Sequence, residues 1–133
     1  MSEFKVHLIS HDQELHLDLA GMLTEIDCEL STSSDYLEGV LAVEKSEPDI
    51  VVVYLGNMNE DVGLLVDSIR HREKVFSVPI LVIVDTISRD EAKEALEIGV
   101  TGMVLRKQDN DEAIIDKIMT LLDSSSRSKT KLY

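Results

Sequence analysis

The sequence predicts an α/β protein of the doubly wound (βα)5 class, in which helices cover both faces of a five-stranded parallel sheet. Three observations predict this class. Five short runs of apolar and β-branched residues alternate with five segments of helical periodicity. Two of those runs, residues 50–55 and 80–84, are continuously apolar, as expected of strands buried on both faces of a parallel sheet. The 133 residues, 44% of them hydrophobic, are enough for one core.

The first half of the chain contains three predicted strands and two predicted helices. Residues 4–9 predict the first strand, and residues 10–12 offer side chains that can cap the helix after it. That helix is indicated by apolar residues on one face of a 3.6-residue period: Leu15, Leu19, Met22, Leu23 and Ile26. Residues 28–32 predict a short second strand, and residues 33–35 can cap a second helix. Pro48 ends that region, and residues 50–55 form the third strand.

The second half repeats the alternation. Residues 56–63 predict a polar loop, and a third helix follows with Val62, Leu65, Val66 and Ile69 on its apolar face. After the fourth strand, residues 80–84, Ser88 and Glu91 have the spacing of a capping box. The fourth helix begins there and stops at Gly99. Residues 102–106 predict the fifth strand. The last helix is capped within residues 109–111 and extends to Leu122.

The chain divides into a folded domain, residues 1–123, and a flexible linker or tail, residues 124–133. The tail is rich in serine and carries three basic residues and no acidic one. The whole chain has 13 basic and 26 acidic residues, so residues 1–123 carry 10 − 26 = −16. This charge disfavours binding to nucleic acid, whose affinity comes mainly from Lys and Arg, and to anionic membranes.

Cysteine content and hydropathy limit the kinds of metal site and the cellular location that the chain can have. The single cysteine, Cys28, excludes an internal disulfide and a cysteine-rich metal site. The apolar runs are far shorter than the roughly 20 residues that a membrane helix needs. No signal-peptide pattern follows Met1. We therefore expect a cytoplasmic protein that neither spans nor docks on a membrane.

Ligands of open α/β sheets bind outside the carboxyl ends of the strands, so the residues that follow each strand are the candidate site. They come from the first, third, fourth and fifth strands: Ser10, His11 and Asp12; Tyr54; Val84 and Asp85; Arg106 and Lys107.

Four segments that end at this edge carry a family resemblance. Residues 5–12, 48–54, 78–85 and 99–106 resemble, in pattern and spacing, the receiver domain of two-component response regulators, the CheY-like family. The resemblance covers residues 5–123. It implies a flavodoxin-like sheet with strand order 2-1-3-4-5 and a function in phosphorelay signal transduction, as in bacterial signalling. Members of the family take a phosphoryl group onto an aspartate at the end of the third strand.

The residues that perform this chemistry in the family are mostly replaced. Family members hold Mg²⁺ with that aspartate and two acidic residues after the first strand, and bind the phosphoryl oxygens with a Thr or Ser and a Lys. The corresponding positions are Tyr54 for the aspartate, Ser10 and His11 for the two acids with Asp12 one residue late, Val84 for the hydroxyl, and Arg106 for the lysine with Lys107 beside it.

These replacements predict a degenerate pseudo-receiver. Tyr54 has no carboxylate to form an acyl phosphate, and Val84 cannot donate a hydrogen bond. Asp12, even with Asp85, is a poor replacement for the carboxylates that Mg²⁺ prefers. We therefore expect no enzyme activity, no catalytic residue, no metal ligand and no cofactor, with Mg²⁺ binding weak or absent. Arg106 is expected to pair with Asp12 and Asp85 and to fix the loops permanently.

The resemblance also indicates partners. We expect protein partners on the face formed by the fourth helix, the fifth strand and the fifth helix, where Ile98, Val100, Met103 and Ile115 are candidate exposed apolar residues. A C-terminal output domain in a longer chain, and a homodimer, are compatible with the sequence. Two alternatives stay open. One is a competent receiver that is phosphorylated at a displaced carboxylate, and the other is a receiver-like domain that senses a small ligand in the emptied acidic pocket.

Overall fold

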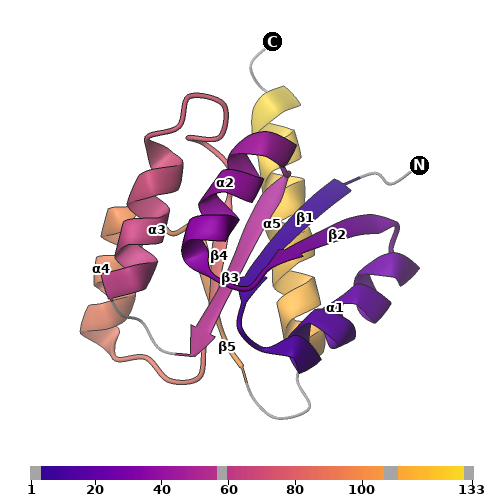
Figure 1. The fold of residues 1–133 in the computed structure, drawn as a ribbon, viewed down its shortest axis with the longest axis horizontal. Helices are drawn as coiled ribbons and strands as arrows, with labels where there is room; N and C mark the ends of the chain where they lie inside the picture. Colours follow the sequence, from indigo (N-terminus) through magenta and orange to yellow (C-terminus); the bar gives the residue numbers. More distant parts are fainter. Residues whose placement is uncertain (1–3, 57–59, 107–110, 131–133) are drawn as a thin grey trace.

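The computed structural model describes residues 4–56, 60–106 and 111–130. Within these ranges strands and helices alternate along the chain (Figure 1). The strands are β1 (Phe4–Ser10), β2 (Cys28–Ser33), β3 (Ile50–Gly56), β4 (Ile80–Val84) and β5 (Gly102–Leu105). The helices are α1 (Gln13–Glu25), α2 (Tyr36–Ser46), α3 (Glu60–Arg70), α4 (Arg89–Ile98) and α5 (Asp111–Thr130).

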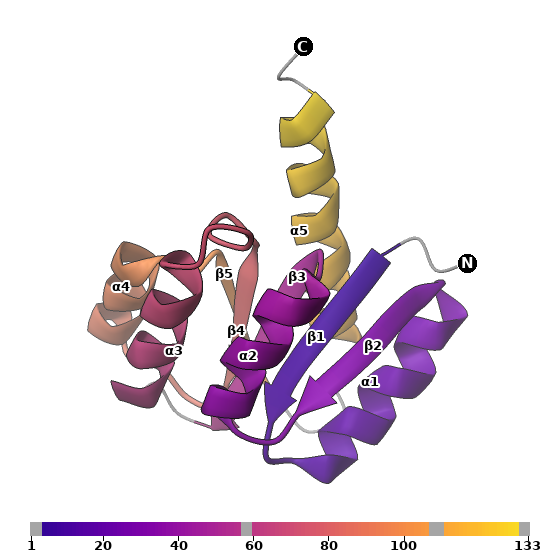
Figure 2. The same cartoon turned by 45° about the horizontal axis from the view of Figure 1, so that its top comes forward.

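The five strands form one parallel sheet in the order β2-β1-β3-β4-β5. This order confirms the predicted doubly wound fold. Because all strands run the same way, their carboxyl ends meet at one edge of the sheet, the lower edge in Figure 2. The register places Ser10, the last residue of β1, opposite Tyr54 of β3.

Helices cover both faces of the sheet, and each face has its own hydrophobic core. Residues of α2, α3 and α4 pack on one face, around side chains such as Val51, Val53 and Val82. Residues of α1 and α5 pack on the other face, around Val52 and Leu81. Successive residues of β3 thus serve opposite cores, which is why that run is continuously apolar. No helix in the described part of the chain is both long enough and apolar enough to span a bilayer.

The predicted helix ends agree with the observed caps. Asp12 is the N-cap of α1 and Asp35 that of α2, and each carboxylate accepts backbone N–H groups of the first turn. Ser88 and Glu91 form the predicted capping box of α4. Gly99 ends α4 with φ +110°, a left-handed conformation that glycine adopts without steric cost.

Several boundaries differ from the prediction; β1 and β3 each end one residue later than predicted, and β5 ends one residue earlier. β2 extends to Ser33, and α3 begins at Glu60, inside the segment predicted to be a polar loop. The backbone of α5 stays helical to Thr130, through a stretch expected to be flexible, and its last turns project past the sheet (Figure 2). Residues 124–130 contain no Gly or Pro, so a helix anchored by its packed turns can continue through them. The division into residues 1–123 and 124–133 stays a prediction.

His7 is a buried polar residue at the centre of β1. It is 2% exposed, and both ring nitrogens are bonded to hydroxyl groups of β2. Nδ1 lies 2.6 Å from Oγ of Ser31, and Nε2 lies 2.7 Å from Oγ of Ser33. Burial disfavours the charged imidazolium and lowers the pKa of His7 to about 4. The ring is therefore neutral in the folded protein at neutral pH.

Arg70, at the end of α3, joins two loops at the other edge of the sheet. Its guanidinium donates to the backbone carbonyls of Phe76 (2.9 Å), Val78 (2.6 Å) and Gly99 (2.7 Å). These carbonyls belong to the segment before β4 and to the end of α4. One planar cation with several donors thus satisfies carbonyls from two separate connections.

Candidate functional site

The carboxyl edge of the sheet brings together most of the residues that the sequence indicated. Ser10, Tyr54 and Val84 lie on β1, β3 and β4, and Asp12, Asp85 and Arg106 lie just beyond the strands. His11 is exposed in the turn between β1 and α1. Lys107 lies outside the described residues.

Asp12 uses both of its carboxylate oxygens. Oδ1 accepts the N–H groups of Glu14 (2.9 Å) and Leu15 (3.2 Å), which caps α1. Oδ2 accepts a hydrogen bond from Nη1 of Arg106 at 2.6 Å. The hydrogen bond from Arg106 lowers the pKa of Asp12, with a smaller contribution from the cap. Asp12 is therefore a negatively charged helix cap that is tied to the end of β5.

Arg106 is held from three sides. Besides the pair with Asp12, its Nε lies 4.0 Å from Oδ1 of Asp111, the first residue of α5. Its guanidinium carbon lies 5.0 Å from the centroid of the Tyr54 ring, within cation–π range. Burial opposes the charge, but the hydrogen bonds with Asp12 and Tyr54 outweigh it, and the pKa of Arg106 is raised. The side chain is a permanent cation at this edge.

Tyr54 links β3 to the turn after β4. Its hydroxyl donates to the carboxylate of Asp85, at 2.9 Å from Oδ1 and 3.0 Å from Oδ2. Burial and the neighbouring carboxylate both raise the pKa of Tyr54, so the hydroxyl keeps its proton. The predicted pairing of Arg106 is thus half right. Arg106 binds Asp12, while Asp85 binds the tyrosine, whose ring is long enough to reach across to β4.

Ser10 and Val84 are buried under this layer. Oγ of Ser10 accepts the N–H of Asp12 at 3.0 Å, which shapes the turn between β1 and α1. Val84 belongs to the core beneath α2, α3 and α4, and its carbonyl accepts the N–H of Arg106 at 2.8 Å. The sequence did not indicate His16, whose Nε2 lies 3.0 Å from the carbonyl of Ser10. Its place one helical turn after Asp12 was the available signal.

The donor groups at this edge do not fit Mg²⁺, which binds here in the family that the sequence resembles. Mg²⁺ requires near-octahedral oxygen ligands, usually including carboxylates. Both oxygens of Asp12 are already bonded, one of them to a guanidinium, and Asp85 accepts the hydroxyl of Tyr54. Among the residues that the structure describes, no three His, Cys, Asp or Glu side chains are grouped so that they could hold a metal ion.

The predicted partner face exposes fewer of the candidate apolar side chains than the sequence predicted. Val100 and Ile115 are buried and Met103 is half-buried, because each packs into or against a core. Ile98 is exposed, but its Cδ1 lies 3.9 Å from where a Cβ of Gly63 would be, so it leans towards α3. The exposed large apolar side chains of α4 and β5 also include Leu96 and Leu105.

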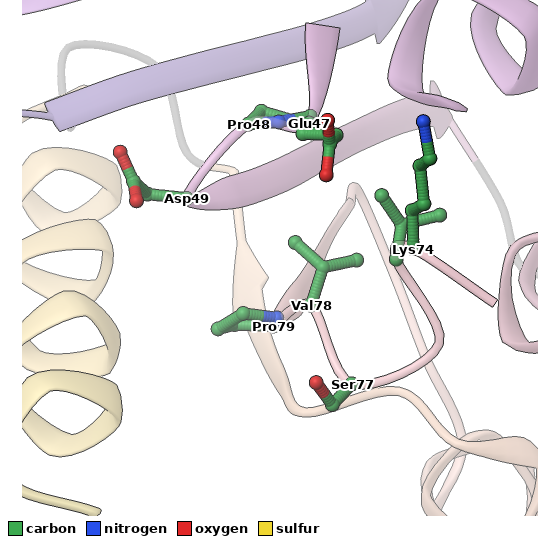
Figure 3. Close-up of a pocket in the computed structure, with 8 residues that line it drawn as sticks. Glu47, Pro48, Asp49, Lys74, Ser77, Val78 and Pro79 are labelled. Carbon is green, nitrogen blue, oxygen red and sulfur yellow. The ribbon is translucent and has the colours of Figure 1, made fainter. Parts of the chain in front are cut away.

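A separate cavity of about 220 Å³ lies at the opposite edge of the sheet, before β3 and β4 (Figure 3). Its lining mixes acidic Glu47 and Asp49 with Lys74, Ser77 and two prolines. The carboxylate of Asp49 is already bonded to the backbone N–H of Lys5 at 2.7 Å. None of the predicted site residues that the structure describes lines this cavity, so the candidate site remains the carboxyl edge.

Solved structures with the same fold include a response regulator and a receiver domain. The chemotaxis response regulator CheY4 of Vibrio cholerae has a TM-score of 0.79 and 19% identity, covering 89% of this chain and 98% of that one. A receiver domain of a Pseudomonas aeruginosa sensor histidine kinase, with a magnesium ion coordinated in its active site cleft, has a TM-score of 0.72 and 16% identity, covering 86% and 93%. NtrX from Brucella abortus has a TM-score of 0.79 and 18% identity, covering 100% of this chain and 30% of that one.

At these identities the likeness establishes the fold alone. No family model matches the sequence, and no curated protein does either. The chain therefore has the CheY-like receiver fold, and its function must be argued from the carboxyl edge itself.

Proposed function

We propose that the chain is a receiver-like signalling module that acts through protein–protein contacts and is not phosphorylated. The observation that carries this proposal is the position of Tyr54. It lies two residues before the end of β3, at the position where the resembling family has its phosphate-accepting aspartate, and its hydroxyl is bonded to Asp85. A phenol at this position offers no carboxylate for an acyl phosphate, and Val84 offers no hydroxyl for a phosphoryl oxygen.

The side chains at this edge act as a fixed substitute for the contacts that switch a competent receiver. Asp12 ties the start of α1 to Arg106, and Arg106 stacks on Tyr54, which in turn holds Asp85 in the turn before α4. These side chains thus connect the carboxyl ends of four strands. The module would present one surface constantly, with Mg²⁺ binding weak or absent and no enzyme activity of its own.

The partner surface we propose is the face of α4, β5 and α5. Leu96 and Leu105 are exposed there, and large exposed apolar side chains on a folded domain favour contact with other proteins. In a longer chain the module would be joined to an output domain, and this is supported by its correspondence to 30% of the NtrX chain. The composition and the resemblance favour a cytoplasmic location.

The proposal is tested by phosphorylation in vitro. The full chain is incubated with Mg²⁺ and acetyl phosphate, and its intact mass is measured over time beside a competent receiver. We expect no gain of mass in this chain. A stoichiometric gain of one phosphoryl mass that hydroxylamine removes would contradict the proposal and support the displaced-carboxylate alternative.

A further inference from the structure

A groove between α2 and α3, far from the carboxyl edge, has no role in the function proposed above. The two helices lie side by side in both views (Figures 1 and 2). Near their C-terminal ends they enclose an open groove of about 540 Å³, lined by Glu44, Asp67, Ser68, His71, Arg72 and Glu73. Three carboxylates and one guanidinium give this lining a formal charge of −2 with His71 neutral.

Exposed apolar residues continue the lining of the groove along the same stripe of each helix. On α2, Leu37 and Leu41 precede Glu44 at i, i+4 and i+7, so the three share one stripe of the helix. Leu37 is 67% exposed and Leu41 is 55% exposed. On α3, Leu64 precedes Ser68 by four residues and is 56% exposed, and His71 follows directly after the last residue of the helix. The surface is therefore acidic towards the C-terminal ends of both helices and apolar towards their N-terminal ends.

A ligand complementary to this surface would carry basic residues next to apolar ones. The chain itself contains such a segment. Residues 124–133 include Arg127, Lys129 and Lys131 and no acidic residue, and they end in Leu132 and Tyr133. Opposite charge and adjacent apolar residues thus match the two halves of the groove when the tail runs antiparallel to the two helices.

The groove and the tail of one molecule lie on different sides of the sheet. α5 packs with α1 on one face, whereas α2 and α3 cover the other. The last turns of α5 also project away from the sheet (Figure 2). A tail that stays helical to Thr130 therefore points away from its own groove, and a second molecule can receive it.

We propose that the α2–α3 groove binds the basic C-terminal segment, residues 124–133, of a second copy of this chain. Each copy offers one groove and one tail, so the exchange can be reciprocal and closed in a dimer. The proposal is independent of whether the carboxyl edge is phosphorylated. It also uses a different face from α4, β5 and α5.

The first test is the association state of the full chain by sedimentation velocity, from micromolar to about millimolar concentration. We expect a monomer–dimer equilibrium at 0.15 M salt that shifts to monomer at 1 M salt, because screening weakens exposed charge pairs. The tail variant Arg127→Gln, Lys129→Gln, Lys131→Gln should stay monomeric. A full chain that is monomeric throughout, or a dimer that the tail variant retains, would overturn the proposal.

The second test separates the groove from other acidic surfaces. A fluorescein-labelled peptide of residues 124–133 is titrated onto the full-length tail variant, whose own tail no longer competes. Leu41→Ser, and separately Asp67→Asn with Glu73→Gln, should each weaken binding about tenfold. Leu17→Ser is the matched control, because Leu17 is 75% exposed on α1, on the opposite face. Equal losses in the groove and control variants, or no binding of the peptide, would refute the groove.

Discussion

Lowering the pH from 7 to 5 is expected to destabilise the domain through His7. The ring is buried in β1, and its pKa is about 4 in the folded protein, against 6.5 in an unfolded chain. The unfolded state therefore binds a proton more readily than the folded state. The stability that comes from keeping His7 neutral is complete above pH 6.5 and is lost progressively as the pH falls to 4.

The two pKa values set the size of the effect. Their difference of about 2.5 corresponds to a loss of about 3 kcal/mol at pH 4 and below, at about 1.36 kcal/mol per pKa unit. About 2 kcal/mol of this is already lost at pH 5, where most carboxylates are still ionised. A domain of this size has a total stability of about 5–15 kcal/mol, so the change is readily measured.

The assay is urea unfolding followed by circular dichroism at pH 7 and pH 5. His7→Gln keeps one donor and one acceptor for Ser31 and Ser33 and removes the titrating group. It should therefore lose much less stability between the two pH values than the parent. His11→Gln is the control, because it makes the same substitution at a histidine that is exposed in the turn after β1. If the parent and His7→Gln lose the same free energy, the reasoning is wrong.

Three further predictions concern the two edges of the sheet. Arg106→Gln should speed amide hydrogen exchange in the turns after β1 and β4, because it releases Asp12 and removes the cation that stacks on Tyr54, the partner of Asp85; unchanged exchange there would argue against the proposed connection. Arg70→Lys should lower the free energy of unfolding by about 2 kcal/mol in urea titrations, since a single ammonium nitrogen cannot occupy the positions of both guanidinium nitrogens that bond these carbonyls. Tyr54→Asp should not restore phosphorylation by acetyl phosphate, as measured by intact mass; a stoichiometric gain would contradict our account of the edge.

The fold was predictable because its signals are local and repeated. The continuous apolar runs of β3 and β4 required cover on both faces, and caps such as Ser88 and Gly99 marked helix ends. The C-terminal limit of α5 was not predictable in the same way. A serine-rich segment has neither a helix breaker nor an apolar face, so its state depends on the packed turns that precede it.

The strand-end positions of most candidate residues were predictable, but their partners were not. Strand ends alone placed Asp12, Asp85 and Arg106 at one edge, and the sequence offered Arg106 both carboxylates equally. Tyr54 decides which carboxylate pairs with Arg106. Its hydroxyl donates a hydrogen bond to Asp85, and its ring lies within cation–π range of the Arg106 guanidinium. Such a selection depends on the length of one side chain and on distances of a few ångströms, which spacing along the sequence does not specify.

The pairing of Asp12 with Arg106 explains why the single substitution Tyr54→Asp should not make the chain accept a phosphoryl group. An aspartate there would be too short to reach Asp85, and it would lie beside an arginine that already holds Asp12 at 2.6 Å. Arg106 would then compete with Mg²⁺ for both carboxylates, and Val84 would still leave the phosphoryl oxygens one donor short. Restoring the chemistry therefore requires freeing Asp12 as well as supplying a new carboxylate. We expect Tyr54→Asp combined with Arg106→Lys and Val84→Thr to bind Mg²⁺ more tightly than Tyr54→Asp alone, which isothermal titration calorimetry can measure.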